Sequence, residues 1–361
     1  MIAIQDILAA IGVVFNGIPM MIFAMSYGFL AAPTAIGYMI GAGGMLIAGQ
    51  VMPISIQAGT IALVGTMGKD VKERLSIALY AGIFMVVVGA FGLIHSVMNF
   101  AGPRVVFGMQ AGVGIILAKV AIDMIKSDKF VGLVSLISAL VVYFIARVLD
   151  PAQDLVYTIV ISVVVSSIAY YFKNKKPIEV MSEKYKLTLY KPTINYNIVR
   201  GALALACLTI GSNIAFGNLT ARVFAGVENP NINALTVYSG LANLSALFGG
   251  APVESIISAT GRAPNPMLAG ILMMVIMAVI LVTGLLPKIA RFIPMQSIAG
   301  FLFIIGSFAT LPGNAFNAFN GAERAEFLGA GVALLVTALT DPFIGLMSGS
   351  VILRLAPLIG L

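Results

Sequence analysis

The chain has 361 residues, of which 60% are hydrophobic and 10% are charged. A soluble domain is about 45–50% apolar and about 25% charged, so this composition excludes a single water-soluble core. The formal net charge of +7 does not indicate nucleic acid, because the basic residues lie in short clusters between apolar runs. The apolar runs are continuous rather than alternating, which predicts an all-α, multi-pass integral membrane protein of the cell membrane.

Apolar runs punctuated by charge, glycine and proline predict fourteen membrane segments. The first seven segments are expected at 4–28, 34–50, 53–67, 75–97, 104–125, 129–148 and 152–172. The last seven are expected at 198–225, 233–248, 252–261, 266–286, 292–311, 325–340 and 342–360. The domains predicted are therefore a first repeat at 1–172, a polar linker at 173–197 and a second repeat at 198–361. An odd number of segments per half places the two repeats in opposite orientations across the membrane.

The third segment of each half is too short to cross the membrane as an ordinary helix. QVMPISIQAGTIALVG breaks at Pro53, and FGGAPVESIISATG breaks at Pro252 after the pair Gly249 and Gly250. Such Gly/Pro-interrupted segments at matching places of two halves are the best sequence indication of a transporter binding site. We therefore predict that they meet near the bilayer centre; the alternative is two merely kinked helices.

Few residues are available for metal or cofactor chemistry. The chain has one cysteine, Cys207, and one histidine, His95. No Walker, Rossmann or zinc signature is present, so the sequence predicts neither an enzyme nor a bound metal or cofactor. A membrane scaffold without transport activity has no positive feature in its favour.

Several motifs in order resemble the nucleobase–cation symporters of the xanthine/uracil permease type. The matching stretches are IQDILAAIGVVFNGIP from Ile4, PTAIGYMIGAGGMLIAG with MPISIQAG, FGMQAGVGIILAKVAI from Phe107, FGGAPVESIISATG, and IPMQSIAGFLFIIG. The resemblance implies a core and a gate domain, with two short strands and two half-helices at the substrate site. It also implies symport of a purine or pyrimidine with H⁺ or Na⁺ by alternating access, and homodimers are common in such families.

The sister sulfate permeases (SulP) are similar in architecture, and GGAPVES also suits their anion site. An anion permease or channel, in which half-helix N-termini bind sulfate or a carboxylate, is therefore the alternative function. In either case the partners predicted are a small-molecule solute and the lipid bilayer.

Two carboxylates expected from the resemblance are missing. Their positions, in the eighth span and the tenth segment, are occupied by Ile214 and Ser258. Glu254 lies four residues before Ser258, one helical turn away on the same face. We predict that Glu254, at the start of a half-helix, is the substrate-proximal acid, because an ionisable group within a membrane is functional by default. The alternative role is a carboxylate that caps the break. An ionised Glu254 argues against an anion substrate, since like charges repel strongly at low dielectric.

Polar residues around the two breaks and in the eighth span complete the predicted substrate site: Ser55, Gln57, Thr60, Asn213, Ser255 and Ser258. Amide side chains offer both donors and acceptors, although hydrogen bonding between helices would explain them equally well. Asn16, Gln110 and Asn243 are expected to be structural. Arg262 either faces an anionic substrate or extends to the membrane interface.

The distribution of charge predicts an orientation that conflicts with the resemblance. Of 21 Lys and Arg residues, 15 fall on the side that holds the linker. The positive-inside rule then places the linker in the cytoplasm and both termini outside. The resemblance implies cytoplasmic termini, and we favour the charge bias because it recurs at four separate loops.

Overall fold

A computed structural model describes residues 3–151, 154–175 and 187–360. The polar linker expected at 173–197 is described only at its two ends, so its central basic residues, such as Lys184, lie outside the described residues. The helices before the linker are α1 (Ile4–Ser26), α2 (Ala31–Ile47), α3 (Ala58–Met67), α4 (Val71–Ala90), α5 (Ile94–Ala101), α6 (Pro103–Ser127), α7 (Lys129–Leu149) and α8 (Asp154–Asn174). Those after it are α9 (Tyr196–Asn218), α10 (Ile232–Ala242), α11 (Pro266–Val282), α12 (Leu285–Ala290), α13 (Ala299–Ile304), α14 (Leu311–Phe319), α15 (Arg324–Leu339) and α16 (Pro342–Leu355).

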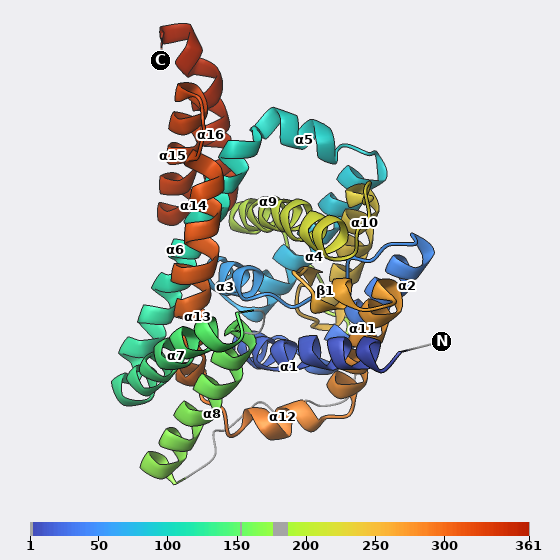
Figure 1. The fold of residues 1–361 in the computed structure, drawn as a ribbon, viewed down its shortest axis with the longest axis vertical. Helices are drawn as coiled ribbons and strands as arrows, with labels where there is room; N and C mark the ends of the chain where they lie inside the picture. Colours follow the sequence, from blue (N-terminus) through green and yellow to red (C-terminus); the bar gives the residue numbers. More distant parts are fainter. Residues whose placement is uncertain (1–2, 152–153, 176–186, 361) are drawn as a thin grey trace.

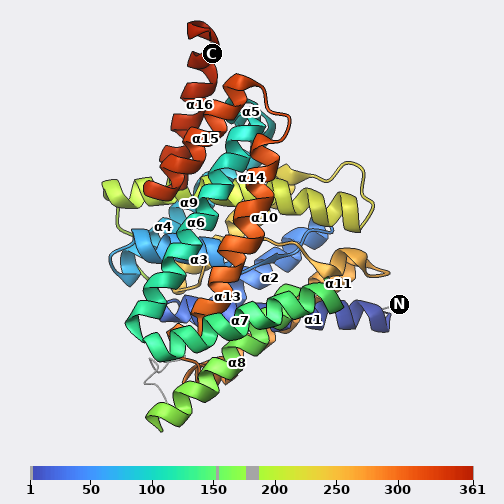
Figure 2. The same cartoon turned by 60° about the vertical axis from the view of Figure 1, so that its left-hand side comes forward.

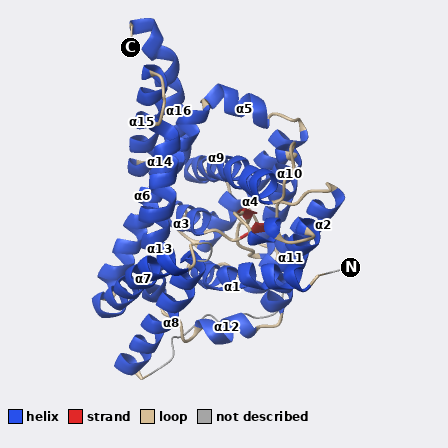
Figure 3. Cartoon of the chain, viewed as in Figure 1, coloured by secondary structure: helices blue, strands red, loops and turns tan. Residues whose placement is uncertain are grey.

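The remaining elements are short. Two strands, β1 (Ile54–Ser55) and β2 (Glu254–Ser255), lie among the helices near the middle of the molecule (Figure 3). Short 3₁₀ or π segments are η1 (Leu219–Phe224), η2 (Asn243–Phe248), η3 (Ala259–Arg262), η4 (Met295–Ile298), η5 (Ile305–Thr310) and η6 (Ala356–Ile359).

The molecule is a multi-pass membrane protein. Within the described residues, seven helical stretches are long and apolar enough to cross a bilayer, and shorter apolar helices accompany them. Many side chains on these helices are apolar and exposed, such as Ile47, Val148 and Phe172. An apolar surface of this kind is stable only against lipid.

Three predicted segments differ from the structure. The segment expected at 292–311 is a helical stretch from Met295 to Phe319. The segment at 75–97 is wrong as one span, because α4 ends at Ala90 and α5 is a separate helix. Gly92 lies between them with a φ of +68°, a left-handed conformation that ends the helix and redirects the chain. The segment at 252–261 is a strand followed by the one-turn η3, and not a half-helix that begins at Pro252.

The helices pack in two groups, of which one lies on the left in Figure 1 and comes forward in Figure 2, in front of the other. The first helix group contains α1–α4, α9–α11 and both strands, and the second helix group contains α6–α8 and α13–α16. The short helices α5 and α12 connect the two groups along the chain. Each group thus combines elements from before and after the linker.

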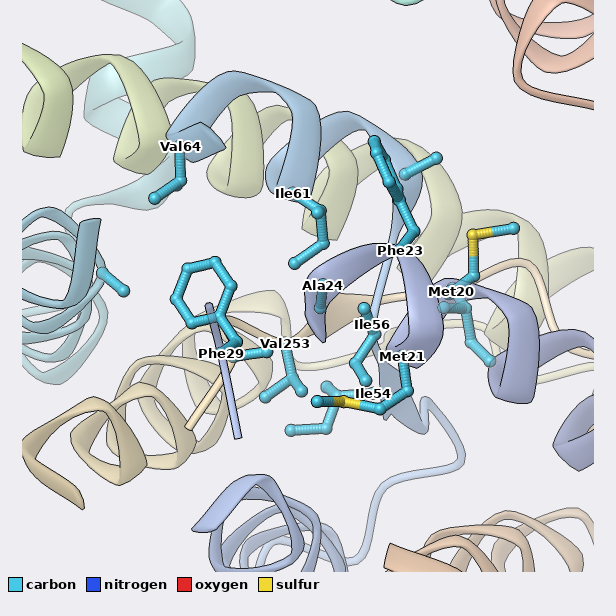
Figure 4. Close-up of a cluster of buried hydrophobic side chains, with 14 of the residues drawn as sticks. Met20, Met21, Phe23, Ala24, Phe29, Ile54, Ile56, Ile61, Val64 and Val253 are labelled. Atoms are coloured by element: carbon cyan, nitrogen blue, oxygen red, sulfur yellow. The ribbon is translucent and has the colours of Figure 1, made fainter. Parts of the chain in front are cut away.

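A buried apolar cluster supports the strands within the first helix group. Met21 and Phe23 of α1 pack with Ile54 of β1, Ile61 of α3 and Val253 (Figure 4). All five side chains are at most 1% exposed. The strand pair is therefore fixed on a packed base rather than on mobile loops.

Close helix packing in the second group depends on Gly300, and this yields a test of the fold. A Cβ atom added to Gly300 of α13 would lie 2.1 Å from the backbone oxygen of Ser135 on α7. Gly300→Ala should therefore lower stability by about 1–3 kcal/mol, as overpacking does. Gly43→Ala in α2 is the matched control, because nothing lies within 4 Å of its added Cβ, and it should be neutral or stabilising by up to about 1 kcal/mol. Thermal unfolding in detergent measures both variants, and equal melting temperatures would contradict this packing.

Candidate functional site

The two broken segments meet. Strands β1 and β2 pair antiparallel, with Ile54 opposite Ser255 and Ser55 opposite Glu254. Pro53 comes directly before β1, and Pro252 comes two residues before β2. Proline cannot donate to a ladder and is tolerated at such strand starts. The breaks thus place two extended stretches beside each other instead of two helices.

Side chains from neighbouring helices satisfy the backbone at these breaks. The N–H of Val253 donates to Oδ1 of Asn243 at 2.8 Å, and that of Ser255 donates to Oδ1 of Asn213 at 3.2 Å. The N–H of Ile56 donates to the hydroxyl of Tyr38 at 3.2 Å. The same Tyr38 hydroxyl forms a hydrogen bond with Oγ of Ser55 at 2.7 Å. Non-helical backbone within a membrane requires such partners. Asn213, a predicted substrate ligand, is therefore placed where it holds β2.

A cavity of about 210 Å³ lies beside the strands, between the two helix groups. On the first group it is lined by α1, β1, the end of α9 and the residues after β2; on the second, by α8, η5 and α14. Its polar walls are the side chains of Asn16, Ser55, Gln57, Thr310 and Asn314. None of its lining residues is charged. Binding sites of transporters commonly lie at such a boundary between groups of helices.

The N-cap residue of α3 lies at this cavity. Gln57 is the N-cap residue, lines the cavity, and makes no side-chain hydrogen bond to the helix. The first backbone N–H groups of a helix have no partner within it, and the helix dipole adds about half a positive charge there. Uncapped N–H groups beside a neutral cavity can hold an anion without any basic side chain.

The second break differs from the first. Ser258 caps η3 by accepting a hydrogen bond from the N–H of Thr260 at 3.2 Å, and η3 is only four residues long. Ser258 is fully buried and does not line the cavity. Of the two breaks, only the first thus places an uncapped N-cap residue, Gln57, at the cavity.

Glu254 lies behind the strand pair, with its side chain directed at α9. Its carboxyl faces the hydroxyl groups of Ser212 and Thr209. The residue is 2% exposed, and its Oε2 atom has no hydrogen-bond partner within the described ranges. No lysine or arginine in the described part of the chain pairs with it. Because Glu254 lies in β2, the expectation that it begins a half-helix and shares a helix face with Ser258 is wrong: extended backbone is stabilised here by Asn213 and Asn243.

The other predicted site residues separate into two sets. Ser55 and Gln57 line the cavity, whereas Thr60 and Ser255 are buried beside the strands without lining it. Gly249, with a φ of +99°, and Gly250 turn the chain from η2 toward Pro252. Arg262 stacks over the ring of Phe224 at 4.0 Å and lies away from the cavity.

Three polar residues of the cavity are absent from the predicted site. Asn16 was expected to be structural, yet it lines the cavity, and its Oδ1 atom has no hydrogen-bond partner among the described residues. Thr310 and Asn314 come from the second helix group, where η5 is a π segment inserted between α13 and α14. Such π segments occur frequently at functional sites, but residue spacing in a sequence does not show them.

Comparisons with known proteins identify the fold. No family model matches the sequence, and no curated protein matches it. The structure is similar to the transmembrane domain of BicA, a cyanobacterial bicarbonate transporter, with a TM-score of 0.68 at 16% identity over 96% of this chain and 97% of that domain. It is also similar to SLC26A9, with a TM-score of 0.74 at 14% identity over 99% of this chain and 65% of the other.

A third solved structure, the murine anion transporter Slc26a9 in its inward-facing state, gives a TM-score of 0.70 at 15% identity over 99% of this chain and 68% of that one. The chain thus spans about two thirds of the length of the SLC26A9 chains. These likenesses support the sister resemblance to sulfate permeases, and they do not support the xanthine/uracil permease identity. The chain has the fold of SLC26/SulP-type anion transporters.

Proposed function

We propose that the protein is a secondary-active transporter of a small inorganic anion or carboxylate in the cell membrane. The observation that carries the proposal is the uncapped N-terminus of α3 beside an uncharged cavity between the helix groups. The likeness of the fold to anion transporters supports it. An anion thus replaces the nucleobase that the sequence motifs favour as the proposed substrate.

The proposed mechanism is alternating access by movement of one helix group against the other. The first group carries the α3 terminus and both strands, so it would hold the anion while the second group uncovers each side in turn. In this scheme the fourteen segments form two inverted repeats. The third and the tenth segments are the two that are broken. The mixing of elements from both halves in each group supports this arrangement.

We further propose that Glu254 carries a proton when the anion is bound. An uncompensated charge in a buried site costs several kcal/mol, and no cationic partner is present among the described residues. A neutral Glu254 removes the like-charge repulsion that would oppose an anion nearby. Proton-coupled anion transport follows, with Glu254 behind the strand pair as the titratable group.

A ligand panel tests the proposed function. Purified protein in detergent is heated with chloride, bicarbonate, sulfate, acetate, xanthine or uracil, each at matched ionic strength. We expect one or more anions to raise the melting temperature, since ligands that bind only the folded state stabilise it by mass action. Stabilisation by xanthine or uracil alone would overturn the proposal.

The orientation predicted from charge is tested by cysteine labelling. Lys191→Cys lies on the linker side and Glu228→Cys on the side of the termini, and both positions are exposed. In a Cys207→Ser background, an impermeant maleimide should label Glu228→Cys in intact cells and label Lys191→Cys only after permeabilisation. Labelling of Lys191→Cys alone in intact cells would place the termini in the cytoplasm instead.

A further inference from the structure

A second cavity, of about 150 Å³, lies beneath the connecting helix α5. It is enclosed by α4 and α9 of the first helix group, α6 and α16 of the second, and α5 itself. Its side-chain walls are apolar except for Cys207 and Ser350, and the Ser350 hydroxyl already donates to the backbone oxygens of Leu346 and Ala101, at 2.7 and 3.0 Å. A water molecule needs two or more polar partners, so this cavity suits an apolar occupant.

One face of α16 joins the cavity to a positive charge. Phe343, Leu346, Met347 and Ser350 line the cavity at spacings of three and four residues, which places them on one side of the helix. Arg354 continues that side one turn beyond Ser350. Its guanidinium lies 4.4 Å from the ring of Phe100, another cavity residue. Arg354 forms no ion pair within the described residues, although its Nη1 donates to the backbone oxygen of Ser350 at 2.8 Å and its Nη2 donates to that of Phe100.

The mouth of the cavity faces the lipid-exposed surface of the molecule. Phe84, Phe100 and Met347 line the cavity and are also exposed, at 39%, 53% and 37%. An apolar cavity of this size holds a molecule as large as benzene, so it admits the end of one hydrocarbon chain and not two. A guanidinium has five N–H donors, and the three that do not bond to Ser350 or Phe100 can pair with a carboxylate.

We propose that this cavity is a fatty-acid site: the hydrocarbon chain enters beneath α5, and the carboxylate pairs with Arg354. Because the walls come from both helix groups, an occupant stabilises their present arrangement relative to any in which they separate. Fatty acid should therefore slow alternating access. This regulatory effect rests on the proposed function, whereas binding does not.

Fluorescence quenching tests binding without any transport assay. The chain contains no tryptophan, so Phe100→Trp supplies a single tryptophan at the cavity, which is excited selectively over the tyrosines. Phe130→Trp is a matched control: Phe130 is 50% exposed and has Nζ of Lys173 at 5.5 Å from its ring, but it lines no such cavity. Each variant in lipid nanodiscs is titrated with dodecanoate brominated at its terminal carbon.

We expect saturable quenching for Phe100→Trp and only gradual, non-saturable quenching for Phe130→Trp. Adding Arg354→Gln to Phe100→Trp should lower the affinity measured from the saturable quenching about tenfold. Adding Val97→Phe, which fills the cavity, should abolish it, whereas Val87→Phe on the exposed face of α4 should not.

Equal, non-saturable quenching of both tryptophans would overturn the site. Saturable quenching of equal strength by brominated phosphatidylglycerol would also overturn it, because a two-chain lipid would then be the occupant. Failure of the anion panel would leave these titrations unchanged, so the two proposals fail separately.

Discussion

Gln57→Glu is expected to reduce anion binding by at least about 100-fold while the protein remains folded. The substitution keeps the shape of the side chain and adds one negative charge at the cavity, beside the N-terminus of α3. Two like charges about 6 Å apart repel by about 2.8 kcal/mol at an effective dielectric constant of about 20, which is about 100-fold in affinity. Isothermal titration with the anion found in the ligand panel measures the loss.

The melting temperature of the variant distinguishes this electrostatic effect from damage to the fold. A negative charge at a helix N-terminus is favourable by about 0.3–1 kcal/mol, so the melting temperature without anion should not fall. Gln57→Met is the matched control, because it removes the amide without adding charge. It should weaken binding about tenfold at most, the value of one hydrogen bond. If Gln57→Glu binds the anion as well as the wild type does, the anion does not lie at α3.

Glu254→Gln is expected to abolish proton-driven accumulation of the anion in liposomes. The wild type should accumulate anion when the outside is at pH 5 and the inside at pH 8, because Glu254 takes up a proton on one side and releases it on the other. Glutamine preserves the contacts with Ser212 and Thr209 but carries no exchangeable charge. The variant should still exchange labelled anion for unlabelled anion, at a rate that does not depend on pH.

The control for Glu254 is Ser258→Ala. Ser258 caps η3 and lies outside the cavity, so its loss should cost about 1 kcal/mol of stability and leave proton-driven uptake intact. Glu254→Gln should be at least as stable as the wild type, since it removes an unpaired buried acid. If Glu254→Gln retains the affinity, rate and pH profile of the wild type, the carboxyl is structural only.

The broad fold could be predicted because its signals are local in the sequence. Apolar runs show the membrane helices, and α6 and α7 begin and end within a few residues of the expected limits. The breaks at Pro53 and Pro252 could be found because proline and glycine interrupt segments that are too short to span the membrane as helices. Their matching places in the two halves pointed to the paired strands.

The composition of the cavity could not be predicted, because it depends on packing between distant segments. Asn16 and Asn213 are the same residue type, each within a long apolar helix, yet the first lines the cavity and the second holds β2. Asn314 reaches the cavity after a π segment, which changes the helix phase that residue spacing assumes. Glu254 was placed on a helix because no local signal shows that Asn213 and Asn243 would stabilise extended backbone there.

The pairing of β1 with β2 also constrains how the chain is made. Ser55 and its partner Glu254 are about 200 residues apart, and ribosomes add about 5–20 residues each second. The first strand is therefore synthesised roughly 10–40 seconds before its partner exists. During that interval its exposed backbone groups cannot face hydrocarbon without a penalty of several kcal/mol. The nascent first half must consequently wait inside the insertion machinery or at a hydrated surface, and a chain truncated before residue 254 should be recognised by membrane quality control and degraded.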